Sequence, residues 1–135
     1  MNIIDLPFNQ HIGLEKEGEL VLLKHQECLS NHVGTLHASV IHGLAEAASG
    51  NFLILNLMPQ FPEWLVLLKR ADITYKRPAS DDCRAIAEVG DDSLQSCIET
   101  LNTRKTAVLS VPVKVFCGDK VVATAEFDWW FRLKC

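Results

Sequence analysis

The longest apolar segment of the chain runs from Thr35 to about Leu57. Because it is too long for a typical strand and contains no proline, it predicts one long helix, which Pro59 and Pro62 would end. Apolar residues spaced three and four apart in this segment form a stripe that should face the core. The residues of the stripe are Val40, Ile41, Leu44, Ala48 and Leu55.

Strand-like segments lie on both sides of the predicted helix. In the last of them apolar and polar residues alternate, so one face, which includes Phe127, should be buried. Residues 117–120 would join the last two strands as a hairpin. Pro112 cannot donate a ladder hydrogen bond, so it should lie at a sheet edge or a bulge. The predicted strands are residues 19–28, 64–77, 83–89, 107–116 and 121–132, and residues 93–104 predict a short helix.

One long helix cannot cover both faces of a sheet of about five strands. We therefore expect an α+β fold in which a curved antiparallel sheet is wrapped around one central helix. The opposite face of the sheet would be partly hidden by another subunit. A length of 135 residues fits a single domain, residues 1–135.

Charge and composition argue against several classes of partner. Thirteen Lys and Arg against seventeen Asp and Glu give a net charge of −4, whereas nucleic-acid-binding proteins normally carry a basic excess. His42 and Glu46 interrupt the apolar segment that comes nearest to a membrane span. The first ten residues lack a basic signal-peptide region, and the five cysteines form no C-x-x-C pair. We expect a cytoplasmic protein with reduced thiols and with neither nucleic acid nor a membrane as partner.

Glu46 is the single carboxylate in the predicted helix. At 100° per residue it lies opposite the apolar stripe, among small or polar residues. It either pairs with His42 one turn earlier or reaches solvent, or else it acts as a general base or nucleophile in a dry crevice. The residues around it are Ser39, His42, Gly43, Ser49 and Gly50.

The start of the helix is a candidate anion site. Thr35 is a suitable N-cap, which would leave the amides of about Leu36 to Ala38 unpaired and able to hold an oxyanion or phosphate. His37 and Glu46 are nine positions apart and would face opposite ways on a regular helix. If both serve one site, either His37 belongs to the turn or Glu46 works with a neighbouring subunit.

Residues 31–37 have the pattern Asn-x-x-Gly-Thr-Leu-His, and an acid follows nine residues after the histidine. This pattern resembles the phenylacetyl-CoA thioesterase-like branch of the hotdog-fold acyl-CoA thioesterases. Residues 73–79 are similar to the family's strand that ends in a Tyr-x-x-Pro-Ala turn. Three features differ from the family pattern: Ala38-Ser39 replaces Gly-Gly, Glu46 replaces the commoner Asp, and residues 66–70 lack a hydroxyl.

The resemblance implies a hotdog fold and hydrolysis of an acyl-CoA or acyl-carrier thioester. Glu46 would be the general base or nucleophile, Asn31 would orient water or the carbonyl, and His37 would fix the turn. The family's crevice lies between two subunits, which implies a homodimer or a dimer of dimers. The resemblance also implies backbone oxyanion contacts from Gly34, Leu36 and Ala38, and substrate contacts from Ser39, His42, Lys76 and Arg77.

Two other functions remain open on the sequence. One is a non-catalytic acyl-CoA-binding hotdog domain, and the other is a hydratase of the same fold with His37 or His42 as base. A metal site is not expected, because histidines spaced by five (His32, His37, His42) do not converge on a helix. We expect no cofactor.

Overall fold

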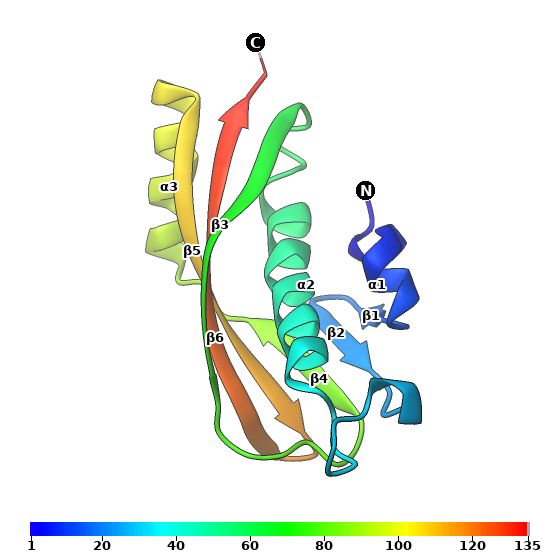
Figure 1. Ribbon diagram of the computed structural model, residues 1–135. Helices are drawn as coiled ribbons and strands as arrows, with labels where there is room; N and C mark the ends of the chain where they lie inside the picture. The colour runs from blue at the N-terminus through cyan, green and yellow to red at the C-terminus, as the bar shows by residue number, and fades with distance from the viewer. Residues whose placement is uncertain (135) are drawn as a thin grey trace.

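The computed structural model describes residues 1–134, which form one antiparallel sheet, a long helix against its inner face and two smaller helical parts (Figure 1). The strands are β1 (Glu15–Glu17), β2 (Leu20–Leu23), β3 (Trp64–Tyr75), β4 (Cys83–Ala87), β5 (Thr106–Cys117) and β6 (Lys120–Leu133). The helices are η1 (Ile3–Asp5), α1 (Pro7–His11), η2 (Glu27–Leu29), α2 (Ala38–Asn56) and α3 (Asp91–Arg104).

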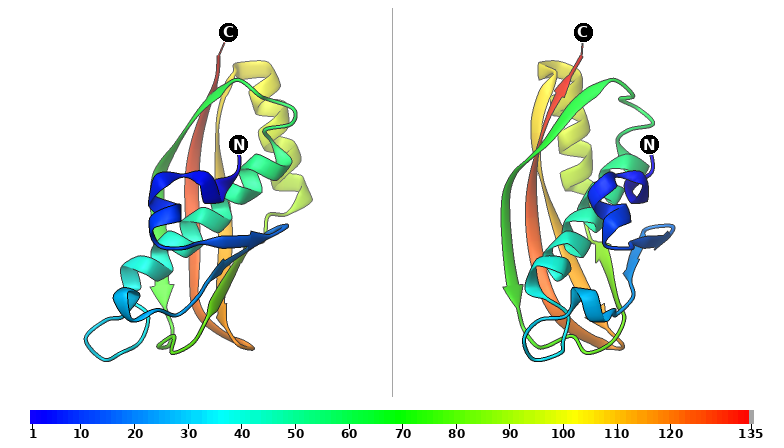
Figure 2. Two further views of the ribbon diagram at one scale, coloured as in Figure 1. Left: turned by 90° about the vertical axis from the view of Figure 1, so that its right-hand side faces the viewer. Right: turned by 45° about the vertical axis from the view of Figure 1, so that its right-hand side comes forward.

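The six strands are ordered β1-β2-β4-β5-β6-β3, and every neighbouring pair is antiparallel. Figure 2 shows that the sheet curves around α2. The α+β class and the sheet wrapped around one helix are confirmed. The sheet has six strands rather than about five, because the predicted strand 19–28 shortens to β2 and pairs with β1 across Gly18. Gly18 has a φ of 59°, in the left-handed region that suits a tight glycine turn.

The apolar stripe of α2 packs against the sheet as the periodicity predicts, with one exception. Val40, Ile41, Leu44 and Ala48 are buried, whereas Leu55 is 39% exposed. In Figure 1 the short strands β2 and β4 lie beside the first turns of α2, so they do not reach Leu55 in the last turn. By length and composition α2 could cross a membrane, but 61% of the relevant window is buried within this fold.

The last hairpin also follows its predicted pattern. Phe127 and Phe131 are fully buried on the face toward α2, while Glu126 and Arg132 are exposed on the other face. Pro112 lies in β5, which is an interior strand rather than an edge. Its carbonyl accepts the Glu88 N–H at 2.9 Å, one residue beyond the end of β4. The missing proline N–H therefore affects only the end of that ladder.

The N-terminal segment, residues 1–14, covers the small-residue face of α2 (Figure 2). Two glycines permit this close approach: a Cβ on Gly43 would lie 3.1 Å from the Phe8 ring, and one on Gly50 would lie 3.0 Å from Ile3 Cδ1. Asn9 connects the two short helices by donating its side-chain N–H to the Ile3 carbonyl at 2.9 Å. The face that carries Glu46 is therefore partly covered by the chain's own N-terminus.

Candidate functional site

Asn31 closes the turn that precedes α2. Its side-chain carbonyl accepts the N–H groups of Val33 and Thr35, each at 3.0 Å, and its NH₂ group donates to the Thr35 hydroxyl at 2.7 Å. Gly34 has a φ of 82°, which other residues adopt only with strain. The contacts of Asn31 therefore fix the loop that positions the start of α2.

The residue that caps α2 is His37, not Thr35 as predicted. His37 Nδ1 accepts the Ser39 N–H at 2.9 Å, and the residue has the extended backbone of an N-cap (φ −64°, ψ 139°). Because Nδ1 is the acceptor, the ring proton of neutral His37 is on Nε2. Thr35 does not fill this role, because its hydroxyl accepts from Asn31 and the His37 N–H that it would cap is donated to the Leu29 carbonyl.

Three of the four backbone amides expected near the oxyanion are already bonded. Gly34 donates its N–H to the Asn31 carbonyl, Leu36 to the Ala79 carbonyl at 2.8 Å, and His37 to the Leu29 carbonyl. The prediction that the amides of Leu36 and His37 are unpaired is therefore wrong, as is an oxyanion contact from Gly34 or Leu36. Within residues 1–134 the Ala38 N–H makes no hydrogen bond.

Ala38 opens onto a cavity of about 400 Å³ at the start of α2. Lys76 and Arg77, which follow β3, lie in the wall of this cavity together with Asn31. The Tyr75 hydroxyl donates to the Ala38 carbonyl at 3.1 Å, and burial raises the pKa of Tyr75, so this hydroxyl stays protonated at neutral pH. One free N–H, the positive end of a helix and two cations thus face one space, which suits an anionic ligand.

Glu46 lies at a second cavity, of about 330 Å³, between α2 and the N-terminal segment. Its side chain is 41% exposed, and its Oε2 lies 3.9 Å from His42 Nδ1. The predicted pairing with His42 therefore exists, but at a distance too long for a hydrogen bond. Residues of the N-terminal segment, including Leu6 and Phe8, form the other wall. The carboxylate can reach both water and a ligand in this cavity.

His42 and Ser39 occupy different surroundings from those of Glu46. The His42 ring packs edge-on against Phe127 of β6, with ring centres 5.6 Å apart. This contact fixes the ring beside Glu46 on the side of β6. Ser39 is exposed in the first turn of α2, and its N–H is bonded to His37. Ser39 therefore lies beside His37 and outside the wall of the Ala38 cavity, and His42 lies with Glu46.

The two cavities are separate within one chain. No residue of the described chain lines both, and Ala38 and Glu46 are eight helical positions apart, which is about 12 Å along the axis. One chain therefore cannot place the Ala38 N–H and the Glu46 carboxylate on the same carbonyl group. The sequence raises the same difficulty for His37 and Glu46, which would face opposite ways on one helix.

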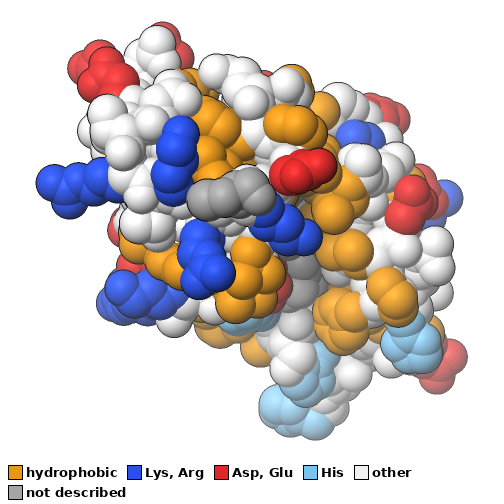
Figure 3. Space-filling view, turned by 90° about the horizontal axis from the view of Figure 1, so that it is seen from above, with side chains coloured by type: hydrophobic (Ala, Val, Ile, Leu, Met, Phe, Trp, Pro, Cys, Tyr) orange, Lys and Arg blue, Asp and Glu red, His pale blue; other side chains and the backbone are white. Residues whose placement is uncertain are grey.

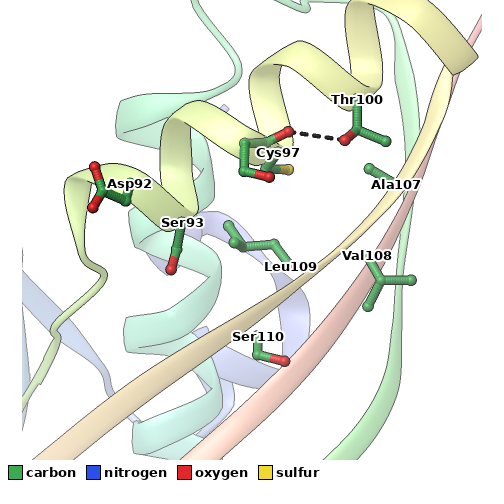
Figure 4. Close-up of a pocket in the computed structure, with 9 residues that line it drawn as sticks. Asp92, Ser93, Cys97, Thr100, Ala107, Val108, Leu109 and Ser110 are labelled. Carbon is green, nitrogen blue, oxygen red and sulfur yellow. Dashed lines mark hydrogen bonds between the residues drawn. The ribbon is translucent and has the colours of Figure 1, made fainter.

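Another cavity, of about 440 Å³, lies elsewhere, between α3 and the first half of β5 (Figure 4). Burial raises the pKa of Cys97 in its wall to about 11, so this thiol is not a nucleophile at neutral pH. The Thr100 hydroxyl donates to the Ser96 carbonyl at 2.9 Å. Between residues 1 and 134, no three His, Cys, Asp or Glu side chains converge to hold a metal ion.

The N-terminal segment is a part of the site that was not predicted from the sequence. Two local signals point to it: Asn2 caps η1 by accepting the Ile4 N–H at 3.3 Å, and Pro7 occupies the first turn of α1. Neither signal indicates where these short helices pack. Their contact with α2 depends on Gly43 and Gly50, which are more than 30 residues away in the sequence.

Comparison with known families shows to which family the chain belongs. The model of the family described as "Domain of unknown function (DUF4442)" matches residues 12–131. The chain belongs to the DUF4442 family. A search of curated proteins finds no match for this sequence. The family description assigns no activity, so the chemistry has to be argued from the site.

Solved structures share the fold of this DUF4442 protein at low sequence identity. A Pseudomonas aeruginosa protein described as a probable thioesterase superposes with a TM-score of 0.85 at 19% identity, over 98% of this chain and 91% of that one. A Bacillus halodurans protein solved with CoA gives 0.66 at 19%, over 96% and 85%. A mutant form of the phenylacetic acid degradation protein PaaI of Thermus thermophilus gives 0.63 at 20%, over 94% and 99%. The hotdog fold implied by the resemblance is confirmed.

Proposed function

We propose that this protein hydrolyses an acyl-CoA thioester, with Glu46 of one subunit and the Ala38 N–H of a second subunit acting on one carbonyl group. The observation that carries the proposal is the pair of separate openings on α2. One presents a carboxylate and the other presents a single free N–H beside Lys76 and Arg77. A two-fold dimer would bring the two openings of different copies together twice.

Glu46 is placed to supply the chemical step. As a general base it takes a proton from water while the water oxygen bonds to the thioester carbon. As a nucleophile it bonds to that carbon itself, and water then cleaves the resulting mixed anhydride. In both routes the carbonyl oxygen gains negative charge and the carbon–sulfur bond breaks. The thiolate takes its proton from Glu46 in the general-base route, and from the water that cleaves the anhydride in the nucleophilic route. The products are a carboxylic acid and CoA thiol.

The start of α2 supplies the electrostatic contribution. The Ala38 N–H would donate to the developing oxyanion, and the positive end of the helix would stabilise its charge. Lys76 and Arg77 would contact the phosphates of CoA, which a Bacillus halodurans protein of the same fold was solved with. Asn31 and His37 would act by fixing the turn that presents the N–H. A CoA thioester as substrate would place the protein in the cytoplasm.

Replacement of Glu46 tests the proposal. We expect Glu46→Gln to lower the rate of thiol release from a panel of acyl-CoAs by at least about 100-fold, because general-base or nucleophilic catalysis is lost. Glu99→Gln, at an exposed carboxylate on α3, is the control and should behave as wild type. Equal rates for Glu46→Gln and wild type would refute the role of Glu46.

The observation that favours a second function is Ala38-Ser39, which stands where the resembling thioesterase branch has Gly-Gly. A binding protein would keep both cavities without turnover. Calorimetry with the same acyl-CoA panel separates the two functions: binding without any thiol release from wild type would establish a non-catalytic acyl-CoA-binding domain.

A further inference from the structure

A third cavity, of about 420 Å³, lies beyond Glu46 at the far end of α2, between this helix, the start of β3 and the N-terminal segment. Its walls carry no charged side chain. They include Leu53, Ile54, Met58, Trp64 and Trp129. The Trp129 indole N–H is already donated to the Ser49 hydroxyl at 2.9 Å. A polar ligand would find few partners here, whereas a hydrocarbon chain would bury apolar surface against these side chains.

This apolar cavity adjoins the Glu46 cavity. Ile3 and Leu6 line both of them, so residues of the N-terminal segment form the boundary between the two spaces. Ile3 packs on Gly50, one helical turn beyond Glu46. The boundary is therefore one aliphatic side chain over a glycine, and a thin linear chain would pass if Ile3 changed its χ2 rotamer.

The length of the path indicates the ligand. Gly50 and Ile54 lie one and two helical turns beyond Glu46, about 6 and 12 Å along the axis. An extended chain advances about 1.2 Å per bond, since three backbone bonds span about 3.6 Å. A chain of about ten carbons that starts at Glu46 would therefore end beside Ile54. Figure 3, which views the molecule from above, shows hydrophobic side chains at the surface in several groups among charged and other side chains.

We propose that the apolar cavity beyond Ile3 binds the tail of a linear saturated acyl group of about eight to twelve carbons. This proposal rests on the proposed function, because it takes Glu46 as the point at which the thioester is cleaved. Ile3 and Ile54 then determine chain-length specificity. Acyl groups of up to about four carbons would occupy the Glu46 cavity alone.

A series of acyl-CoAs from four to fourteen carbons tests the proposal. For wild type we expect kcat/KM to rise by up to about fourfold per methylene between six and ten carbons, as buried methylenes do, and to stop rising beyond twelve. Ile54→Trp fills the apolar cavity and should lower the ratio of the ten-carbon to the four-carbon rate at least tenfold. Leu55→Trp is the matched control, because its side chain is exposed and lines neither cavity.

A binding measurement keeps this test independent of turnover. Decanoate should bind to wild type in a calorimeter and should lose at least tenfold in affinity with Ile54→Trp, whereas Leu55→Trp should bind as wild type. Ile3→Ala widens the boundary between the Glu46 cavity and the apolar cavity, and it should shift the preferred acyl length upward. This variant replaces Ile54→Trp in the test if Ile54→Trp does not fold.

The outcomes distinguish the two proposals. If acyl-CoAs are hydrolysed at rates independent of chain length, or if Ile54→Trp lowers the four- and ten-carbon rates equally, the acyl cavity is refuted and the thioesterase function stands. If no acyl-CoA is hydrolysed but decanoate binds in an Ile54-dependent way, the hydrolytic function is refuted and the acyl cavity stands.

Discussion

Ala38→Pro removes one hydrogen-bond donor from the candidate site without disturbing the helix that carries it. Ala38 is the first residue of α2, where proline is favoured because its N–H is not needed within the helix. The residue before it, His37, already has the extended backbone (ψ 139°) that a following proline requires. The Ala38 side chain is exposed, which leaves space for the proline ring. The substitution therefore changes the N–H and little else.

The expected size of the effect follows from the number of donors. Since the neighbouring amides of Leu36, His37 and Ser39 are bonded within the chain, Ala38 is the one donor that residues 36–39 can offer to an oxyanion. Loss of one such donor costs about 2.7–4 kcal/mol of transition-state stabilisation, or about 100- to 1,000-fold in kcat. The free energy of unfolding should stay within about 1 kcal/mol of wild type, because no hydrogen bond is lost.

The assay compares thiol release from decanoyl-CoA by Ala38→Pro and Ala38→Gly, both checked for stability by urea unfolding. Ala38→Gly keeps the N–H and restores the residue that the resembling family carries, so the difference between the two variants isolates the N–H. If Ala38→Pro folds normally and is as active as Ala38→Gly, this amide does not hold the oxyanion.

Mixing the two inactive variants locates the parts of the site. In a dimer of one Ala38→Pro chain and one Glu46→Gln chain, one of the two shared sites contains an intact amide and an intact carboxylate. Random mixing should therefore restore about a quarter of wild-type activity, because about half of the dimers are mixed and half of their sites are intact. Absence of any recovery in mixed dimers would place both groups in one chain and contradict the cross-subunit site.

Two further predictions concern buried polar groups. Asn51 is fully buried and donates to the Gly18 carbonyl at 3.0 Å. Asn51→Leu should therefore lower the free energy of unfolding by about 1–3 kcal/mol in urea titrations, whereas Asn102→Leu, at an exposed residue, should not. Equal stabilities of Asn51→Leu and wild type would contradict the role of this contact. Burial, with a smaller contribution from Cys117, raises the pKa of Cys83 from 9.0 to about 12. The unfolded thiol ionises first, so the stability that the protonated Cys83 contributes is present below pH 9 and is lost as the pH rises toward 12. Between pH 8 and 11 the free energy of unfolding in urea should decline less for Cys83→Ala than for wild type. Cys28→Ala, at an exposed cysteine, is the control and should decline as wild type does. The same decline in Cys83→Ala as in wild type would refute this effect.

Periodicity predicted the central helix and the long hairpin because both depend on local repetition. The stripe of α2 and the alternation of β6 persist over many residues, so tertiary contacts do not override them. The start of α2 was predicted wrongly because Thr35 and His37 are both able to cap a helix, and the choice between them depends on Asn31. Asn31 binds the Thr35 hydroxyl and leaves His37 as the cap. A residue's own capping preference does not include this competition.

The N-terminal segment lies beyond what local patterns can predict. Its helices are three and five residues long, too short to show a hydrophobic period. Their position depends on two glycines of α2 that the sequence groups with the small and polar residues around Glu46. The glycines instead permit Ile3 and Phe8 to pack closely on the helix. Glu46 is consequently enclosed on one side by its own chain, while its side chain stays 41% exposed.

Ala38-Ser39 stands where the resembling thioesterase branch has Gly-Gly, and this difference bears on whether the site can turn over a thioester. A side chain at these positions would matter if it covered the free amide or prevented the cap. Ala38 is exposed with its N–H unbonded among the described residues, and the Ser39 N–H is accepted by His37 Nδ1, whatever side chain residue 39 carries. The substitution thus leaves the proposed oxyanion donor in place. What it adds is bulk at the mouth of the Ala38 cavity, where a thioester would approach under the proposed function. The cost should therefore appear in substrate binding rather than in the chemical step, and Ala38→Gly should lower KM more than it raises kcat.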